Sequence, residues 1–395
     1  MRTTYTDNTL TLYLEGRIDS ANASAVETEA MEAVNAAPGA ELALDAEELQ
    51  YISSAGLRVL MRLRKQAKKA LPVRNVSPEV YDILEVTGFT ELLDVQKRLR
   101  EVSVEGCQLI GQGGNGSVYR LDEDTIVKVY KPWMAMEDIR RERDFARTAF
   151  INGVPSVIAY DVVKVGDCLG VVFEMLKSDT LGHAMRDDPE HLEEYVDKYV
   201  ALAKTLHATH VPAGSFERIQ DVFHRRADNL TEWCSPEEIA LLHSITDDIP
   251  EADTVTHNDL HPGNIMLLDG ELVLIDMPEV TMGPPVCDLV SIYRDMISAP
   301  KSASSNNVEG SVGMPAEMIA QAGMMFFRKY TGLESQAELE AYFQKIGLLY
   351  AFNVVLICGA GSEAATKVAP LLMDRLLRGV VIPNEQAIRQ LFRTM

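Results

Sequence analysis

The sequence predicts two folds in series. Residues 1–98 are expected to form a compact α/β domain, and residues 105–395 an α+β domain that begins with an antiparallel sheet and continues mainly as helices. Two observations predict this order. Apolar strands alternate with helices over the first hundred residues, which is typical of a compact α/β domain. Further along, a glycine-rich segment between β-branched segments precedes a charge-rich helix and a polar cluster beside a short apolar strand.

The elements of the first domain follow from periodicity. Residues Thr9–Leu14 alternate between polar and apolar, as a half-buried strand does. The next predicted elements are a helix over Ala21–Val34, a strand over Glu41–Asp45, a helix over Ser54–Lys69 and a helix over Val80–Thr87 that Gly88 ends. In the second of these helices, Leu57, Leu60 and Met61 share one face, which is expected to pack on the sheet.

Three segments of this domain, Leu14–Asp19, Tyr51–Leu60 and Asn75–Phe89, resemble the STAS domain of anti-sigma-factor antagonists. The resemblance implies that Ser54 is a regulatory phosphoacceptor and that the domain binds an anti-sigma-type regulator. The amides and dipole at a helix N-terminus favour a phosphate there. Serine is, however, also a preferred N-cap residue of helices, whether or not it is phosphorylated. Ser53 also departs from the family, which often has an aspartate at that position.

The second domain opens with a glycine-rich segment of the pattern Gly-x-Gly-x-x-Gly-x-Val. Its candidate nucleotide-binding residues are Gly111, Gly113, Gly114, Gly116 and Val118. A glycine hairpin lets backbone amides approach phosphates, and Lys128 in the following strand would reach the α and β phosphates. A dinucleotide-binding turn also uses such glycines, but it needs a helix directly after them. Residues 117–120 are strand-forming, so the sequence favours the hairpin.

A charge-rich helix over Met136–Arg147 follows, and it is expected to supply an acidic partner for Lys128. Glu142 is the first candidate, and Glu137 is the alternative. A surface helix with many charge pairs would give the same pattern without any such role.

The polar cluster is the most informative motif. The run from Val255 to Met266 contains Asp259 and Asn264, and Asp276 follows twelve residues after Asn264 at the end of an apolar strand. Phosphoryl transfer needs a carboxylate beside the attacking hydroxyl, and an amide and a second carboxylate that hold magnesium. Asp259, Asn264 and Asp276 are these residue types in that order, so the sequence predicts an ATP- and Mg²⁺-dependent phosphotransferase.

From residue 105 onward, these motifs resemble the aminoglycoside phosphotransferase and choline kinase branch of the protein-kinase-like fold. Residues 257–264 lack the arginine that protein kinases place before the catalytic aspartate, and Asp276-Met-Pro278 stands where they have Asp-Phe-Gly. The resemblance implies a sheet-rich N-lobe over about 105–176 and a helical C-lobe over about 177–395. It also implies that backbone groups from Glu174 to Leu176 bind adenine and that Asp288 buttresses the catalytic loop.

Composition limits the partners. Residues 1–100 hold 15 acidic and 12 basic side chains, and residues 101–395 hold 44 and 25, for a net charge of −22. This charge disfavours nucleic acid and anionic membranes. It is either a solubility feature or an attraction for a cationic, aminoglycoside-like or amino-alcohol-like acceptor. The five cysteines are scattered without a paired motif, and residues 1–7 have no apolar signal, so a cytoplasmic protein is expected.

Two further segments are interpreted from composition. Residues 298–313, rich in Ser, Asn and Gly, are expected to be a mobile lid or a disordered loop. Residues 346–358 are apolar but too few to span a bilayer, so a core helix is expected. The predicted function is phosphorylation of a small-molecule hydroxyl under the control of the first domain. The alternatives are a protein serine kinase acting on Ser54 of a STAS domain and a non-catalytic ATP-binding scaffold.

Overall fold

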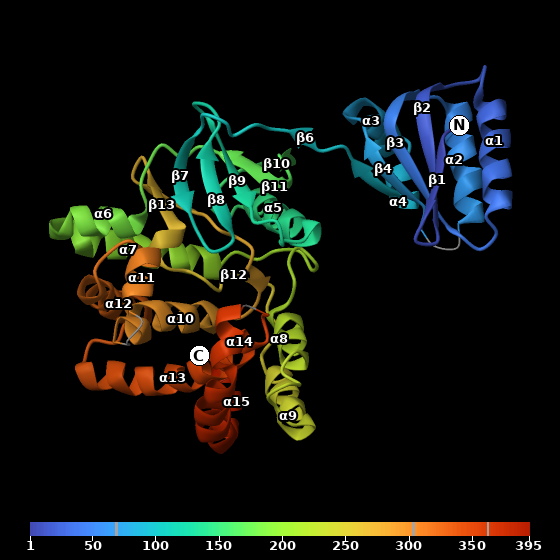
Figure 1. Cartoon of the computed structure of the whole chain (residues 1–395). Helices are drawn as coiled ribbons and strands as arrows, with labels where there is room; N and C mark the ends of the chain where they lie inside the picture. Colours follow the sequence, from blue (N-terminus) through green and yellow to red (C-terminus); the bar gives the residue numbers. More distant parts are fainter. Residues whose placement is uncertain (68–69, 302–304, 362) are drawn as a thin grey trace. The chain divides into compact units, whose positions relative to one another are not determined.

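The chain forms two compact units, Met1–Val102 and Ser103–Met395, shown in the computed structural model of Figure 1. The structure describes residues 1–67, 70–301, 305–361 and 363–395. The first unit is α/β, and the second has sheets in its N-terminal part and helices in its C-terminal part. This confirms the predicted fold class.

A five-stranded sheet with the order β1-β2-β3-β4-β5 is the centre of the first unit. Strands β2 to β5 pair in parallel, and β1 runs antiparallel to β2 at the edge. The strands are β1 (Thr3–Thr6), β2 (Thr9–Ile18), β3 (Glu41–Ile52), β4 (Pro72–Val76) and β5 (Asp94–Lys97). The helices are α1 (Ala23–Ala36), α2 (Ser54–Gln66), α3 (Pro78–Val86) and α4 (Phe89–Leu92).

The core of this unit follows the predicted periodicities. Leu10, Leu12 and Leu14 on alternate positions of β2 are buried, and Leu57 and Leu60 of α2 are buried with them. Helices α1 and α2 contact each other beside the sheet (Figure 1). The periodicity did not reveal β1, β4 and β5. Helix α2 ends at Gln66, and the predicted end at Lys69 lies outside the described residues.

The N-terminal part of the second unit is an antiparallel sheet in which β10, β11, β9, β8 and β7 follow one another. Helix α5 packs on β10 and β11 (Figure 1). The elements are β7 (Gln108–Gln112), β8 (Gly116–Arg120), β9 (Thr125–Tyr130), α5 (Met136–Ile151), β10 (Ala159–Val165) and β11 (Cys168–Glu174). The two-residue strand β6 (Arg100–Glu101) comes before them in the chain.

Helices dominate the rest of this unit, with two small two-stranded sheets, β12–β15 and β13–β14, among them. The elements up to β15 are α6 (Leu181–Asp187), η1 (Pro189–His191), α7 (Leu192–His207), α8 (Ile219–Asp228), α9 (Pro236–Thr246), β12 (Val255–Thr256), η2 (Pro262–Asn264), β13 (Ile265–Leu268), β14 (Glu271–Leu274) and β15 (Thr281–Met282). The remaining elements are α10 (Val286–Tyr293), η3 (Arg294–Ser298), η4 (Ala299–Lys301), α11 (Ser305–Val312), α12 (Ala316–Thr331), α13 (Gln336–Cys358), α14 (Glu363–Leu372), η5 (Met373–Val381), η6 (Ile382–Asn384) and α15 (Glu385–Thr394).

Helix α13 contains the apolar stretch at residues 346–358. By length and composition alone this helix could also span a membrane, but core helices of soluble proteins meet the same two criteria. Here it packs against α10, η5, α8 and α15. Phe352 is fully buried and makes edge-to-face contacts with Phe223 and Phe392, so packing within the unit accounts for the apolar residues.

The predicted loop at residues 298–313 is instead largely helical. Residues Ser305–Val312 form α11, and residues 302–304 of the predicted loop lie outside the described part of the chain. Val308 and Val312 are buried, which the polar composition concealed. A Cβ placed on Gly182 would lie 1.7 Å from the carbonyl oxygen of Val312, so α11 ends in close contact with α6.

Candidate active site

Lys128 lies in the middle of β9, between Val118 of β8 and Val171 of β11. Its Nζ donates to Oε1 of Glu142 at 2.6 Å and to Oδ1 of Asp276 at 2.8 Å. Burial alone would lower the pKa of Lys128, but the two carboxylates outweigh burial and raise it. The structure therefore brings together a charged ammonium, a buried glutamate of α5 and an aspartate from far along the chain.

The glycine-rich segment is the turn between β7 and β8. The structure places its predicted residues on β7 (Gly111), in the turn (Gly113, Gly114) and on β8 (Gly116, Val118). A Cβ on Gly116 would lie 2.3 Å from the carbonyl oxygen of Val129, so the close approach of β9 requires glycine there. A Cβ on Gly113 or Gly114 would meet nothing within 4 Å. Open space therefore lies beside the two turn glycines.

The segment after β11 was expected to contact adenine. The amide of Glu174 already donates to the carbonyl of Ile158 at 3.0 Å, and the amide of Met175 donates to Asp124 at 2.8 Å. Among the described residues, the amide of Leu176 has no acceptor. Because the amides of Glu174 and Met175 are already hydrogen-bonded, Leu176 is the remaining candidate in this segment for donating a backbone N–H to adenine.

A fully buried carboxylate, Asp288 of α10, fixes the loop of residues 257–264. It accepts from the backbone amides of His257 at 2.9 Å and Asn258 at 2.5 Å. Asn258 is held at a φ of 62°, a conformation that non-glycine residues adopt rarely. The next residue, Asp259, then accepts at Oδ2 from Nδ2 of Asn264 at 2.9 Å. The loop thus presents Asp259 and Asn264 side by side.

Asn264 and Asp276 are adjacent because the amide of Ile275 donates to the Asn264 carbonyl at 3.0 Å. Asp276 takes a φ of 59°, so a second strained residue lies at the site. Within the described ranges, no cluster of three or more His, Cys, Asp or Glu side chains could hold a metal. Magnesium that is bound together with a nucleotide needs fewer protein ligands, because phosphate oxygens and waters complete its coordination shell. Asn264 donates through Nδ2, which leaves Oδ1 for a cation, so this pair fits magnesium.

Arg294 is a site residue that no sequence motif revealed. Its Nη2 donates to Oδ1 of Asp259 at 2.5 Å, and Nε and Nη2 both donate to Asp295. Burial would raise the pKa of Asp259, but His261, Arg294 and His257 together hold it below its usual value. The sequence feature that could have indicated Arg294 is the charged pair Arg294-Asp295 inside the apolar run 289–297, since charged residues in such a run are expected to have partners.

His261 accepts at Nδ1 from the amide of Gly263 at 3.1 Å and so caps the short helix η2. Its Nε2 lies 3.7 Å from Oδ2 of Asp259. His261 thus contributes both to the shape of the loop of residues 257–264 and to the electrostatic environment of Asp259.

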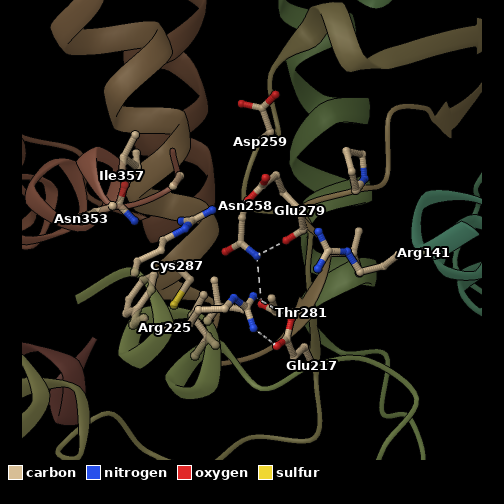
Figure 2. A pocket seen from close by; sticks show the side chains of 18 of the residues that line it. Arg141, Glu217, Arg225, Asn258, Asp259, Glu279, Thr281, Cys287, Asn353 and Ile357 are labelled. Carbon is tan, nitrogen blue, oxygen red and sulfur yellow. Dashed lines mark hydrogen bonds and ion pairs between the residues drawn. The ribbon is translucent and has the colours of Figure 1, made fainter. Parts of the chain in front are cut away.

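A cavity of about 620 Å³ lies beside Asp259, within the usual size range for small-molecule sites. Figure 2 shows Asn258 and Asp259 on one wall, Asn353 and Ile357 of α13 on another, and Arg225 with Glu217 below them. Its charged lining residues are four acids and four arginines: Asp138, Glu217, Asp259, Glu279, Arg141, Arg225, Arg226 and Arg294. The wall is therefore balanced in charge, unlike the acidic domain around it.

In the first unit, Ser54 is the first residue of α2 and is exposed. The N-cap is Ser53, whose hydroxyl accepts from the amide of Ala55 at 3.2 Å. The capping role considered for Ser54 therefore belongs to Ser53. Among the described residues, the Ser54 hydroxyl has no hydrogen-bond partner, so it is available for modification.

Comparison with known protein families matches each unit separately. Residues 1–94 match the model of a STAS domain, and residues 106–310 match that of a phosphotransferase enzyme family, over more than half of the chain. A Bordetella bronchiseptica protein named as an anti-sigma factor antagonist, BtrV, is 35% identical over 92 residues, which are 22% of this chain and 78% of that protein. These matches confirm both resemblances drawn from the sequence.

Solved structures also align with the chain. The ADP-bound aminoglycoside phosphotransferase APH(2'')-Ib aligns with a TM-score of 0.44 and 15% identity, over 72% of this chain and 94% of that one. A choline/ethanolamine kinase family protein from Mesorhizobium loti aligns with a TM-score of 0.46 and 14% identity, over 73% of this chain and 92% of that one.

Proposed function

The chain belongs to the phosphotransferase enzyme family, and we propose that it transfers the γ-phosphoryl group of ATP to a hydroxyl group of a small molecule. The observation that carries the proposal is the convergence of Asp259, Asn264, Asp276 and Lys128 from three separate segments, joined by the contacts described above. These are the side chains that phosphoryl transfer requires.

In the proposed reaction, Asp259 accepts the proton of the attacking hydroxyl. Its pKa is held below the usual value, so the group stays an anion that can orient this hydroxyl. Asn264 and Asp276 would hold magnesium, which when bound would neutralise charge on the phosphates. Asp259 is positioned from both sides, by Asn264 on Oδ2 and Arg294 on Oδ1.

The nucleotide is proposed to bind on the β7–β11 sheet. Lys128, oriented by Glu142, would contact the α and β phosphates. The open space at Gly113 and Gly114 would let backbone amides approach the phosphates, and the free amide of Leu176 would contact adenine. The acceptor would occupy the cavity beside Asp259, whose size suits a small molecule better than a folded protein segment.

The first unit is proposed to regulate the enzyme through a protein partner of the anti-sigma-factor type. Support comes from the STAS match and from the exposed, uncommitted hydroxyl of Ser54 at the N-terminus of α2. We place the enzyme in the cytoplasm, where ATP is abundant. All five cysteines are free thiols, which agrees with a reducing compartment.

The test is phosphate transfer by the purified full chain with magnesium and γ-labelled ATP. Pools of amino alcohols, aminoglycosides, sugars, hydroxy acids and sugar phosphates serve as acceptors. Asp259→Asn is compared with Asp187→Asn, a matched change at an exposed surface pair. We expect label in one small-molecule pool, lost in Asp259→Asn and kept in Asp187→Asn.

Two results would contradict the proposal. Label on the protein, lost in Ser54→Ala, would establish a protein serine kinase instead. ATP binding without transfer to any acceptor or to water would establish a nucleotide-binding scaffold.

A further inference from the structure

Arg226, on α8, is the unusual residue of the cavity beside Asp259. Only 15% of its side chain is exposed, yet among the described residues its guanidinium makes a single hydrogen bond, from Nη2 to Oε2 of Glu279. A guanidinium carries five N–H donors. Among the described residues, no Arg226 nitrogen is fully enclosed without a partner, so its remaining donors are open to the cavity and can receive acceptor oxygens of a bound molecule.

The pair that Arg226 forms is asymmetric. Its partner Glu279 is 51% exposed and can return to water at little cost, whereas the guanidinium stays in the wall. An incoming anion can therefore replace the Glu279 carboxylate. The neighbouring arginine of the cavity lining, Arg225, is half exposed and already donates from both Nη atoms to Glu217.

The position of Arg226 is fixed by the backbone. A Cβ on Gly359, at the end of α13, would lie 1.9 Å from the Arg226 carbonyl oxygen, so α8 and α13 are in tight contact at this point. Asn229, one turn further along the chain, donates to the Gly359 carbonyl at 2.9 Å. The guanidinium thus projects from a rigid crossing of two helices.

The same cavity wall is tied to the catalytic loop. Nδ2 of Asn258 donates to the Glu279 carbonyl at 2.8 Å and to the Thr281 hydroxyl at 2.9 Å, as the dashed lines in Figure 2 show. Arg226 binds the side chain of Glu279, and Asp259 follows Asn258 directly. A molecule held at Arg226 therefore shares one small cavity with the proposed catalytic carboxylate.

We propose that the acceptor carries a compact anionic group, a carboxylate or a phosphate, and that Arg226 binds this group while the acceptor hydroxyl faces Asp259. The inference rests on the proposed function for the role of Asp259, but the anion site itself does not. Planar guanidinium donors match carboxylate and phosphate oxygens well. The four arginines of the wall offset its four acids, so the cavity lacks the negative excess that would select a cation.

Binding is measured first, because it does not depend on transfer. Calorimetry on the full chain compares glycerate and glycerol 3-phosphate with ethanolamine and choline, at equal ionic strength. We expect the anions to bind at least about tenfold more tightly than the amines, and Arg226→Gln to weaken anion binding by about ten- to a hundredfold. Arg186→Gln, at an exposed pair outside the cavity, is the matched control and should bind as the parent does.

Glu279→Gln separates a binding role from a structural one. If Arg226 serves anions, removing its competing carboxylate should tighten anion binding, opposite in sign to Arg226→Gln. If the pair only supports the fold, both variants should weaken binding and lower the melting temperature together. Amines binding as tightly as the anions, or equal binding by Arg226→Gln, would overturn the inference. Anion binding through Arg226 without phosphate transfer would overturn the proposed function and leave the anion site intact.

Discussion

Arg294 donates from Nη2 to Oδ1 of Asp259 at 2.5 Å across thirty-five positions of sequence, and so places a permanent cation against the proposed catalytic carboxylate. Asn264 holds the other oxygen of this carboxylate. Protein kinases carry an arginine immediately before the corresponding aspartate, and this chain has Asn258 there. The long-range pair thus gives Asp259 a fixed orientation that its immediate sequence neighbour does not provide.

Arg294→Ala should therefore lower kcat more than it raises KM. Loss of one of two anchors lets Asp259 rotate away from the hydroxyl, and a displacement of about 1 Å can cost about a hundredfold in rate. Steady-state kinetics with and without added guanidinium ion test this, since the ion should restore part of kcat in the cavity left behind. Arg186→Ala is the control. An unchanged kcat in Arg294→Ala would refute the positioning role.

Glu142→Gln should lower activity, whereas Glu137→Gln on the same helix should not. Glu142 is buried, and its Oε1 lies 2.6 Å from Nζ of Lys128. Without this carboxylate, Asp276 would be the remaining partner of Lys128, and the stronger pairing would draw the Asp276 side chain away from its proposed role in holding magnesium. Glu137 is exposed on the first turn of α5 and has no partner among the described residues. The KM for ATP and kcat of the two variants decide between them, and equal effects would exclude Glu142 as the specific partner.

The sequence predicted most of this site because its groups lie within short motifs. The segment from 257 to 264 contains both Asp259 and Asn264, and the glycine pattern specified the hairpin. What it could not predict depends on distant packing. Arg294 reaches Asp259 only because α10 brings it there, and Arg226 faces the cavity because α8 crosses Gly359 of α13.

The choice between Glu142 and Glu137 had a similar limit. Both lie on one charge-rich helix, and only Glu142 lies on the face that contacts Lys128. The prediction of a loop at residues 298–313 was wrong because the local composition is misleading. Two isolated valines, Val308 and Val312, are buried and so anchor one face of α11, although the local composition is polar.

Gly116→Ala should destabilise the second unit by about 2 kcal/mol, since the new Cβ would overlap the Val129 carbonyl and push β8 from β9. Gly113→Ala meets no atom and should fold as the parent does, but it should raise the KM for ATP by filling space that we assign to the phosphates. Thermal melting and ATP kinetics on both variants separate the two roles. A cold-sensitive or unfolded Gly113→Ala protein would contradict the open-turn geometry.

Asp288→Asn should lower the free energy of unfolding by about 3 kcal/mol. The fully buried carboxylate accepts from two backbone amides and from Nε2 of His207 at 3.0 Å. An asparagine has one acceptor oxygen and would face some of these donors with its own N–H groups. Urea denaturation, with Asp187→Asn as the exposed control, measures the loss. A stable variant with unchanged kcat would show that the loop holds its shape without Asp288.

Ser53→Ala and Ser54→Ala should separate the helix cap from the proposed phosphoacceptor. Ser53 accepts from the amide of Ala55, so its loss should destabilise the first turn of α2 by about 1 kcal/mol and speed hydrogen exchange of the first-turn amides. The Ser54 hydroxyl has no hydrogen-bond partner among the described residues, so Ser54→Ala should leave exchange unchanged. Mass spectrometry of the chain after incubation with ATP and an anti-sigma-type kinase should find phosphate on Ser54 in the parent and in Ser53→Ala. Phosphate that persists in Ser54→Ala would place the modification elsewhere, and faster exchange in Ser54→Ala would return the capping role to that residue.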